Sequence, residues 1–151
     1  MNYYYDYPSP IGILHIVEED GFLVGVHLAD WKEEGVRVET PLIREADTQL
    51  TEYFLKRRTQ FNLPIRLRGT PFQETVWEAL RTIPYGEAVS YGEIASQIGR
   101  PKASRAVGGA NHKKPLLIVV PCHRVIGANK SLAGFEAGLL VKKYLLDLEK
   151  Q

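Results

Sequence analysis

The sequence predicts an α+β protein, in which a small N-terminal unit built on an antiparallel sheet precedes a mainly helical C-terminal unit. Three observations support this fold class. The first part of the chain carries β-rich segments separated by turn residues, a helical pattern starts at Pro41, and the composition changes near Arg68-Gly69 toward further helical patterns. We therefore expect two domains, at residues 1–67 and 68–151.

Turn chemistry and apolar spacing define the N-terminal elements. Pro8-Ser9-Pro10 is expected to end the first strand, and the Asp20-Gly21 step predicts a hairpin. The predicted elements are strands at 3–7, 11–17 and 22–28, a helix from Pro41 with Ile43, Ala46, Leu50 and Phe54 on its buried face, and a short strand at 63–67.

The C-terminal half begins with a strong helix start. Thr70 is a good N-cap, Pro71 suits the first helical position and Glu74 lies in the first turn. The apolar stripe of this helix consists of Phe72, Val76, Trp77, Leu80 and Ile83, and Pro84-Tyr85-Gly86 ends it. The later predicted elements are helices at 90–98 and 103–111, a buried strand at 116–120, a glycine-containing loop at 127–138 and an amphipathic helix at 139–149.

The helices on either side of Gly99-Arg100-Pro101 resemble a helix-turn-helix, although two adjacent core helices are the commoner source of this pattern. Gly108-Gly109 costs the second helix roughly 1 kcal/mol per glycine relative to alanine. Because glycine permits close approach of another backbone, this pair is compatible with contact to a DNA backbone.

Charge divides unevenly along the chain. Residues 1–69 hold 8 Lys/Arg and 11 Asp/Glu, whereas residues 70–151 hold 11 and 7. The stretch from Arg100 to Lys130 contains seven basic residues and no acidic one. Such a run is often only a solvated face, but clustered cations also form surfaces that bind phosphates.

Composition narrows the class of protein. With 44% apolar and 25% charged residues in 151, the chain is typical of a folded globular protein. The apolar run at 115–120 is too short to cross a bilayer, and residues 1–6 do not resemble a secretory signal. The single cysteine excludes an internal disulfide and a thiolate-cluster metal site, and His15, His27 and His112 lack ligand-like spacing. We therefore expect a soluble intracellular protein that holds no metal.

The segment at 121–125, Pro-Cys-His-Arg-Val, is the strongest candidate for chemistry. A lone buried cysteine is usually a packing residue, and a buried histidine is usually structural. Here, however, Cys122 follows an apolar run and precedes His123 and Arg124, which could supply the base or the positive field that a thiolate nucleophile needs. The motif by itself leaves hydrolase, redox and transferase chemistry open.

Four blocks of the C-terminal half follow one another in a recognisable order. They are the segments at 90–95 (SYGEIA) and 104–110 (SRAVGGA), the reactive motif at 121–127 (PCHRVIG), and Lys142-Lys143-Tyr144-Leu145-Leu146 with Glu149. Together they resemble the O6-alkylguanine-DNA alkyltransferase family, also called methylated-DNA–protein-cysteine methyltransferases. The opening at 7–12 (YPSPIG) is similar as well. The resemblance implies a ribonuclease H-like N-terminal domain and a winged-helix-like C-terminal domain with a helix-turn-helix.

The resemblance also implies a role for each matching residue. Cys122 would accept the alkyl group, with His123 as its base through a water molecule, Glu149 orienting His123, and Tyr91 as acid toward N3 of guanine. Arg105 would enter the base stack. The remaining DNA-binding residues would be Ser104, Ala106, Gly108, Gly109, Lys114 and Arg124, and the substrate pocket would contain Val125, Phe135, Glu136 and Ala137. The carbonyls of Cys122 and Val125 would accept from the guanine amine, and the Glu136 amide would bind O6.

The implied activity is the direct repair of duplex DNA. One alkyl group would move irreversibly from O6-alkylguanine to Cys122, with O4-alkylthymine left open as a second substrate. The base must leave the stack before the thiolate can reach the alkyl carbon. The resemblance implies a cytoplasmic monomer that needs no cofactor, no metal and no membrane.

The sequence departs from the family at several positions. Lys114 stands where most members have an asparagine, so the turn at 111–115 must be held differently, by the Asn111 side chain or by Pro115. Lys114 is then expected to contact a phosphate, although a solvated lysine without a role is the alternative. Glu136-Ala137 and Lys130 also differ from the usual residues.

Two other functions stay open at this stage. A family relative that recognises lesions without transferring the alkyl group would lack the acceptor cysteine, which is present here as Cys122. A winged-helix transcription regulator with a redox-sensing cysteine would be expected to dimerise and to prefer one DNA sequence. Incubation with O6-benzylguanine separates the three hypotheses, because only the transferase would gain the mass of one benzyl group.

Overall fold

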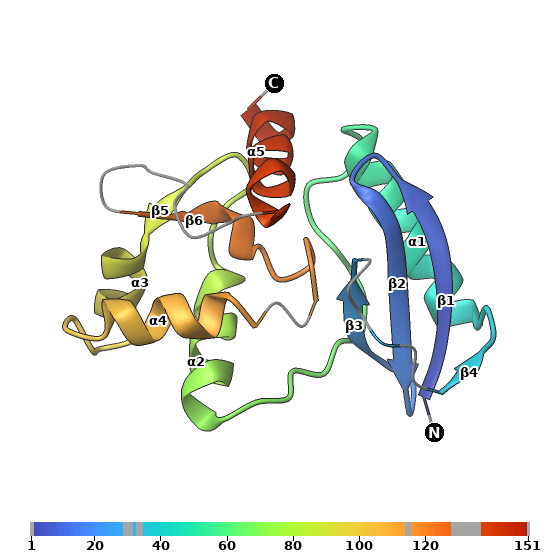
Figure 1. Cartoon of the computed structure of the whole chain (residues 1–151), viewed down its shortest axis with the longest axis horizontal. Coiled ribbons are helices and arrows are strands. Elements are labelled where there is room, and N and C mark those ends of the chain that lie inside the picture. The colour runs from blue at the N-terminus through green and yellow to red at the C-terminus, as the bar shows by residue number, and fades with distance from the viewer. Residues whose placement is uncertain (1, 29–31, 33–34, 114–115, 128–136, 151) are drawn as a thin grey trace. The chain divides into compact units, whose positions relative to one another are not determined.

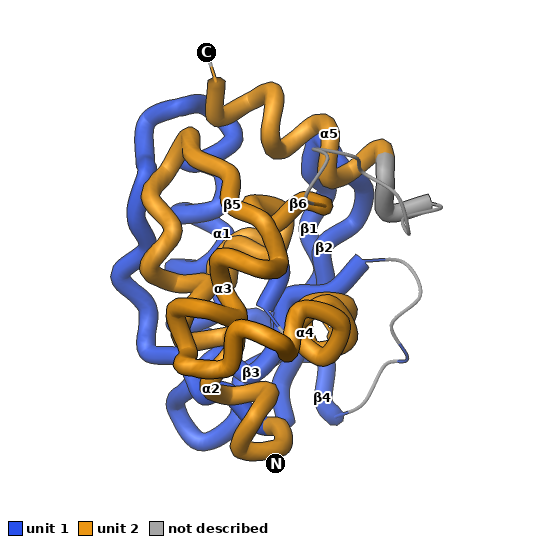
Figure 2. Tube along the Cα trace, turned by 90° about the vertical axis from the view of Figure 1, so that its left-hand side faces the viewer, with its two compact units in different colours: residues 1–68, 115–117 blue, residues 69–114, 118–151 orange. Residues whose placement is uncertain are grey.

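The structure is a computed structural model that describes residues 2–28, 32, 35–113, 116–127 and 137–150. The chain forms two compact units, shown in different colours in Figure 2. The first comprises residues 1–68 and 115–117, and the second comprises 69–114 and 118–151. In the described part of the chain, every helix is too short or too polar to cross a lipid bilayer.

The first unit is built on a four-stranded sheet with the order β3-β2-β1-β4 (Figure 1). The strands are β1 (Asn2–Ser9), β2 (Gly12–Glu19), β3 (Phe22–His27) and β4 (Val36–Arg37). Strands β1, β2 and β3 are antiparallel, as the hairpin signals predict, but β4 pairs parallel with β1. The sheet is therefore mixed, which corrects the expectation of a purely antiparallel one.

The two hairpin turns of this sheet are tight. Asp20 and Gly21 both have positive φ, 52° and 83°, which is the geometry that an Asp-Gly step favours. The prediction that proline ends β1 at Pro8 is wrong, because β1 continues to Ser9 and Pro8 pairs with Ile13. Proline is tolerated there because β4 pairs only with the start of β1, so Pro8 lies on an open strand edge.

Helix α1 (Pro41–Phe54) packs against the sheet. It begins at the predicted position, where the Thr40 side chain accepts a hydrogen bond from the Ile43 amide at 3.1 Å. Tyr53, and not the expected Phe54, is the fully buried aromatic residue of its last turn. The short strand expected at 63–67 is reduced to a single bridge between Ile65 and Leu23.

The described residues of the second unit form four α-helices, one turn of 3-10 helix and a two-stranded parallel sheet (Figure 1). The helices are α2 (Pro71–Leu80), α3 (Tyr91–Gln97), α4 (Ser104–Asn111) and α5 (Ala137–Lys150), and the strands are β5 (Val89–Ser90) and β6 (Val125–Ile126). A core formed by Val76, Leu80, Ile94, Val107 and Leu145 lies inside this unit. The Trp77 indole N–H donates to the Ala110 carbonyl at 3.0 Å and so ties α4 to α2.

The buried strand expected at 116–120 does not form. Leu116 forms an isolated bridge with Val26 of β3, and the Leu117 amide donates to the Val26 carbonyl at 3.1 Å. Ile118 then has φ of 71°, which breaks the extended conformation. The segment is buried, as its apolar composition indicates, but a short apolar run does not distinguish a strand from an irregular buried segment.

A reciprocal pair of capping hydrogen bonds starts α2. The Thr70 hydroxyl accepts from the Gln73 amide at 3.1 Å, and the Gln73 side chain accepts from the Thr70 amide at 2.9 Å. Replacing Thr70→Ala should lower the free energy of unfolding by about 1 kcal/mol, measured by urea denaturation. Thr70→Ser keeps the hydroxyl and is the control. Equal stability of the alanine and serine variants would contradict this account of the cap.

Candidate active site

The reactive motif forms a single turn of 3-10 helix over Cys122–Arg124. The Arg124 amide donates to the Pro121 carbonyl at 3.0 Å, and the Cys122 carbonyl accepts from the Val125 amide. Successive side chains of such a turn diverge by about 120° because it has three residues per turn. Cys122 and His123 therefore point in different directions although they are adjacent in the sequence.

The small parallel sheet places α3 beside this turn. Val89 pairs with Val125 and Ser90 pairs with Ile126, so the chain enters α3 directly next to the residues that follow Cys122. The Ser90 hydroxyl caps α3 by accepting from the Glu93 amide at 3.1 Å. Tyr91, the first residue of α3, consequently lies near the thiol, and a charge on Cys122 contributes to raising the pKa of Tyr91.

A buried carboxylate organises the site. Glu149 is on the last turn of α5 and its side chain is 1% exposed. It accepts from His123 Nε2 at 2.6 Å, from Arg124 Nε and Nη2 at 2.8 and 3.0 Å, and from the Gly86 amide at 3.2 Å. A buried charge is tolerated only when it is paired and hydrogen-bonded, and Glu149 meets both conditions.

These contacts define the state of His123. Burial lowers its pKa, and the charges of Arg124 and Lys142 lower it further, against the opposing effect of Glu149. The neutral ring donates its Nε2 proton to Glu149, which leaves Nδ1 as an acceptor. Nδ1 is buried and has no hydrogen-bond partner among the described residues. The site therefore holds a neutral imidazole with one basic nitrogen that is not engaged by the described side chains.

Arg124 is buried and paired inside the second unit, which argues against the DNA contact expected from the sequence. It is 7% exposed and makes a two-point ion pair with Glu149. Its Nη1 donates to the Ile83 carbonyl at 2.7 Å, and its guanidinium lies 5.7 Å from the centre of the Tyr85 ring. A guanidinium engaged by Glu149 and a carbonyl inside the unit does not reach a phosphate.

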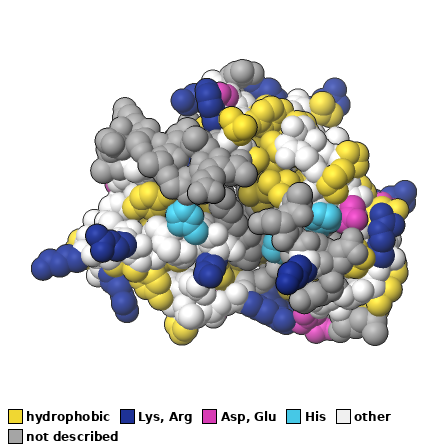
Figure 3. Space-filling model, in the orientation of Figure 1, with side chains coloured by type: hydrophobic (Ala, Val, Ile, Leu, Met, Phe, Trp, Pro, Cys, Tyr) yellow, Lys and Arg dark blue, Asp and Glu magenta, His cyan; other side chains and the backbone are white. Residues whose placement is uncertain are grey.

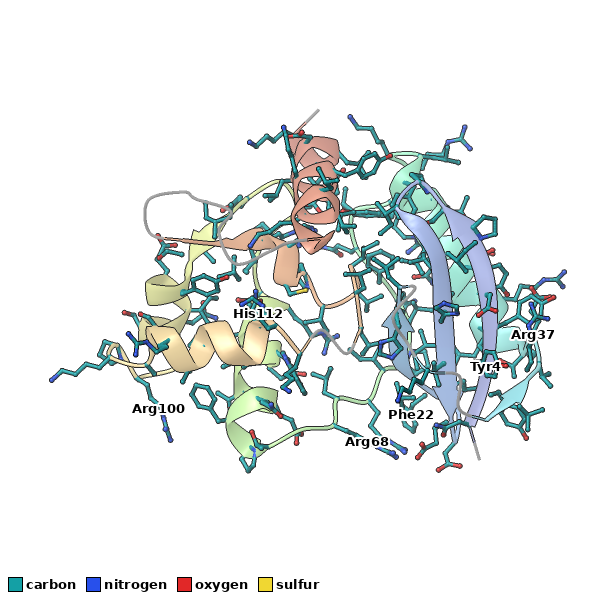
Figure 4. The ribbon with its side chains drawn as sticks, in the orientation of Figure 1. Tyr4, Phe22, Arg37, Arg68, Arg100 and His112 are labelled. Atoms are coloured by element: carbon teal, nitrogen blue, oxygen red, sulfur yellow. The ribbon has the colours of Figure 1, made fainter. Side chains whose placement is uncertain are left out.

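Helix α4 has a solvent face that matches the proposed contact with DNA. Arg105, Ala106 and Gly109 are exposed, and Ser104 and Gly108 are partly exposed. Lys and Arg side chains project from this end of the second unit in Figure 3, and Figure 4 marks Arg100 in the turn before α4. A Cβ at Gly109 would touch nothing in the described chain, so packing within the protein does not explain this glycine.

Several expected site residues lie outside the described residues. Lys114, Phe135, Glu136 and the Lys130 departure are among them. Ala137 is the first residue of α5, and nothing is inferred from its side chain. Among the residues that the structure does describe, no group of three or more His, Cys, Asp or Glu side chains could hold a metal ion.

The sequence predicts no site role for two polar residues that the structure buries. Lys142, on the same face of α5 as Glu149, is 3% exposed and donates from Nζ to the Val125 carbonyl at 2.5 Å. Asn111, the last residue of α4, is 1% exposed and donates from Nδ2 to the Cys122 carbonyl at 3.3 Å. A signal for Lys142 existed, since its seven-residue spacing from Glu149 puts both on one helix face together with Leu145.

Comparison with known proteins covers both units. Residues 2–67 match the ribonuclease-like domain, and residues 71–151 the DNA-binding domain, of 6-O-methylguanine DNA methyltransferase. The constitutive methylated-DNA–protein-cysteine methyltransferase of Bacillus subtilis is 46% identical, over 99% of this chain and 96% of that protein. A relative of the same name from Methanosarcina acetivorans is 48% identical, over 97% of each chain.

Solved structures agree with these matches. The crystal structure of Mycobacterium tuberculosis O6-methylguanine methyltransferase aligns with a TM-score of 0.93 and 44% identity, over 99% of this chain and 93% of that one. A crystal structure of Mycobacterium tuberculosis OGT in complex with DNA aligns with a TM-score of 0.90 and 46% identity, over 98% and 92%. Since sequence and structure agree over both units, the chain belongs to the 6-O-methylguanine DNA methyltransferase family.

Proposed function

We propose that this protein repairs O6-alkylguanine in duplex DNA by moving the alkyl group to its own Cys122. The observation that carries the proposal is the buried pairing of Glu149 with a neutral His123, directly after the only cysteine of the chain. This arrangement supplies an oriented base for a thiol, which is the requirement for cysteine nucleophiles. The same chain carries the exposed Arg105 on α4, and the exposed Arg100, Lys102 and Lys113 flank that helix.

In the proposed reaction, the Cys122 proton passes to His123 Nδ1 through a water molecule. The diverging side chains of the 3-10 turn support a relay rather than direct contact. The thiolate then attacks the alkyl carbon, so that an S–C bond forms while the C–O6 bond breaks. Glu149 stabilises the resulting imidazolium through the 2.6 Å hydrogen bond to Nε2.

The departing guanine requires a proton, and Tyr91 is the proposed donor toward N3. Burial raises the pKa of Tyr91, which keeps the phenol protonated at neutral pH. Donation from a protonated phenol neutralises the leaving base as the C–O6 bond breaks. The thioether product has no reverse path in this site, so each molecule reacts once.

The two carbonyls expected to accept from the guanine amine differ in the partners that they already have. A carbonyl oxygen has two lone pairs. The Cys122 carbonyl already accepts from the Val125 amide and from Asn111 Nδ2, whereas the Val125 carbonyl accepts from Lys142. We therefore propose that the Val125 carbonyl, with a second lone pair, is the main acceptor for the guanine amine.

Duplex DNA is the proposed partner, bound through α3 and α4. Arg105 would enter the base stack, and Gly108 and Gly109 would let the backbone of α4 approach a phosphate strand. Because the described second unit contains Cys122, its base and the helix face for DNA, we propose that a single chain is sufficient for repair. The DNA substrate supports an intracellular location, and we propose domains at 1–67 and 68–151.

Replacing Cys122→Ser should abolish alkyl transfer while leaving affinity for duplex DNA nearly unchanged. A serine hydroxyl has too high a pKa to ionise beside His123, and the exposed face of α4 is untouched. The measurement is intact mass after incubation with O6-benzylguanine, together with a DNA-binding titration. Stoichiometric benzylation of the serine variant would refute Cys122 as the acceptor.

Replacing Arg105→Ala should slow the repair of duplex DNA far more than the reaction with free O6-benzylguanine. The side chain is expected to act only on base extrusion, which costs a few kcal/mol in a duplex and nothing for a free base. The two rate constants are compared in the native protein and in the variant. Arg100→Ala, in the exposed turn before α4, is the control for general loss of charge. Equal losses on both substrates would instead place Arg105 in the pocket.

The rate of reaction with free O6-benzylguanine should depend on the protonation of His123. Because burial lowers the pKa of His123, the base is neutral at pH 7 and becomes protonated only below the ordinary value of about 6.5. The rate should therefore stay high as the pH falls from 7 to 6.5, and then decline at lower pH. A pH–rate profile measures the midpoint of this decline, and a midpoint above 6.5 would contradict a neutral, buried base.

A further inference from the structure

Asn111 is a polar residue at the inner side of the helix that is proposed to meet DNA. It ends α4, its side chain is 1% exposed, and Nδ2 donates to the Cys122 carbonyl at 3.3 Å. Because a carbonyl can only accept, the amide nitrogen and not the amide oxygen must face Cys122. One residue of α4 is therefore hydrogen-bonded to the backbone of the reactive cysteine.

This contact restrains the reactive turn. The Cys122 carbonyl accepts from the Val125 amide on the other side, so donors from two different segments hold one peptide group. The Val125 amide belongs to the turn itself, whereas Asn111 comes from α4. Rotation of the Cys122 peptide would break both hydrogen bonds, and Asn111 thus fixes the backbone from which the thiol projects.

Asn111 also adjoins Tyr91. The Tyr91 ring lies against α4, with one ring carbon 3.9 Å from where a Cβ on Gly108 would be. Gly108 and Asn111 are three residues apart and share one face of the helix. Hydrogen bonding with the Asn111 side chain lowers the pKa of Tyr91, although burial has the larger, opposite effect. The amide nitrogen carries two protons, of which one is donated to the Cys122 carbonyl and the second is available for the phenol oxygen.

We propose that Asn111 is a positioning residue that holds the Cys122 peptide and the Tyr91 hydroxyl through one amide nitrogen. The acid and the nucleophile of the reaction are then aligned with each other and with α4. A phenol oxygen that accepts a hydrogen bond donates its own proton more strongly, because hydrogen bonds in a chain polarise one another. This inference rests on the proposed role of Tyr91 as the acid.

A double-mutant cycle tests the proposal with free O6-benzylguanine as the probe. The variants are Asn111→Leu, Tyr91→Phe and the combination, and the rate constant of benzylation is measured by intact mass. Asn111→Leu should slow the native protein by about 10-fold. In the Tyr91→Phe background it should cost only about 2- to 3-fold, which is the part that acts through the Cys122 carbonyl. Equal losses from Asn111→Leu in both backgrounds would overturn the proposal.

Failure of the underlying function gives a different result. If Tyr91→Phe reacts at the native rate, then Tyr91 is not the acid, and the Asn111 inference fails with it. If Tyr91→Phe slows the reaction but Asn111→Leu costs the same factor in both backgrounds, then Tyr91 keeps its role and only the role of Asn111 is wrong. The rate of the Tyr91→Phe variant therefore tests the proposed acid, and the comparison of the two backgrounds tests Asn111.

The controls distinguish positioning from a general structural role. His112 follows Asn111 at the same helix end and is exposed, so His112→Leu should keep the native rate. Asn111→Leu should also retain duplex affinity within about 2-fold, since α4 keeps its exposed face. Loss of DNA affinity in parallel with the rate would overturn the proposal. If the leucine variant does not fold, Asn111→Ala removes both N–H donors without adding bulk and completes the same cycle.

Discussion

The buried carboxylate of Glu149 is the constraint on which the rest of the site depends. It lies in the last turn of α5, where the helix dipole disfavours an anion, and its side chain is almost completely removed from water. The ion pair with Arg124 and the hydrogen bonds from the Gly86 amide and His123 offset these costs. Because Arg124 and His123 are consecutive residues, the same carboxylate that needs the cation also determines which tautomer of the histidine stands beside Cys122.

Short connections then bring the remaining groups to this turn. Because β5 pairs with β6, Tyr91 lies near the Cys122 thiol. Asn111 at the end of α4 donates a hydrogen bond to the Cys122 carbonyl. The Trp77 indole holds the end of α4 from the opposite side through the Ala110 carbonyl. The helix that we propose to contact DNA is thus tied at its C-terminal end both to the core and to the reactive cysteine. A displacement of α4 on DNA would act directly on the peptide that carries the nucleophile.

The two faces of α4 also explain its unusual composition. Val107, Ala110 and Asn111 are buried, whereas Arg105, Ala106 and Gly109 face solvent. An exposed helix surface is normally filled with good helix formers, and glycine lowers helix stability there. Nothing inside the described chain requires glycine at position 109. The lost stability is consistent with a surface shaped for a partner rather than for the helix itself.

Local chemistry in the sequence determined much of this protein. The caps at Thr70 and Ser90, the Asp20-Gly21 turn and the helical spacings act within a few residues, so they predict the elements before any packing is known. The order of motifs around Cys122 likewise identified the family, which the comparisons confirm. Only the tertiary structure decided the parallel strand β4, the irregular segment at Ile118 and the burial of Arg124. It also decided the contact of Asn111 with Cys122. Some of these features join residues from separate parts of the chain, and others depend on which surfaces are buried. Local spacing in the sequence carries no information about long-range pairing or about burial.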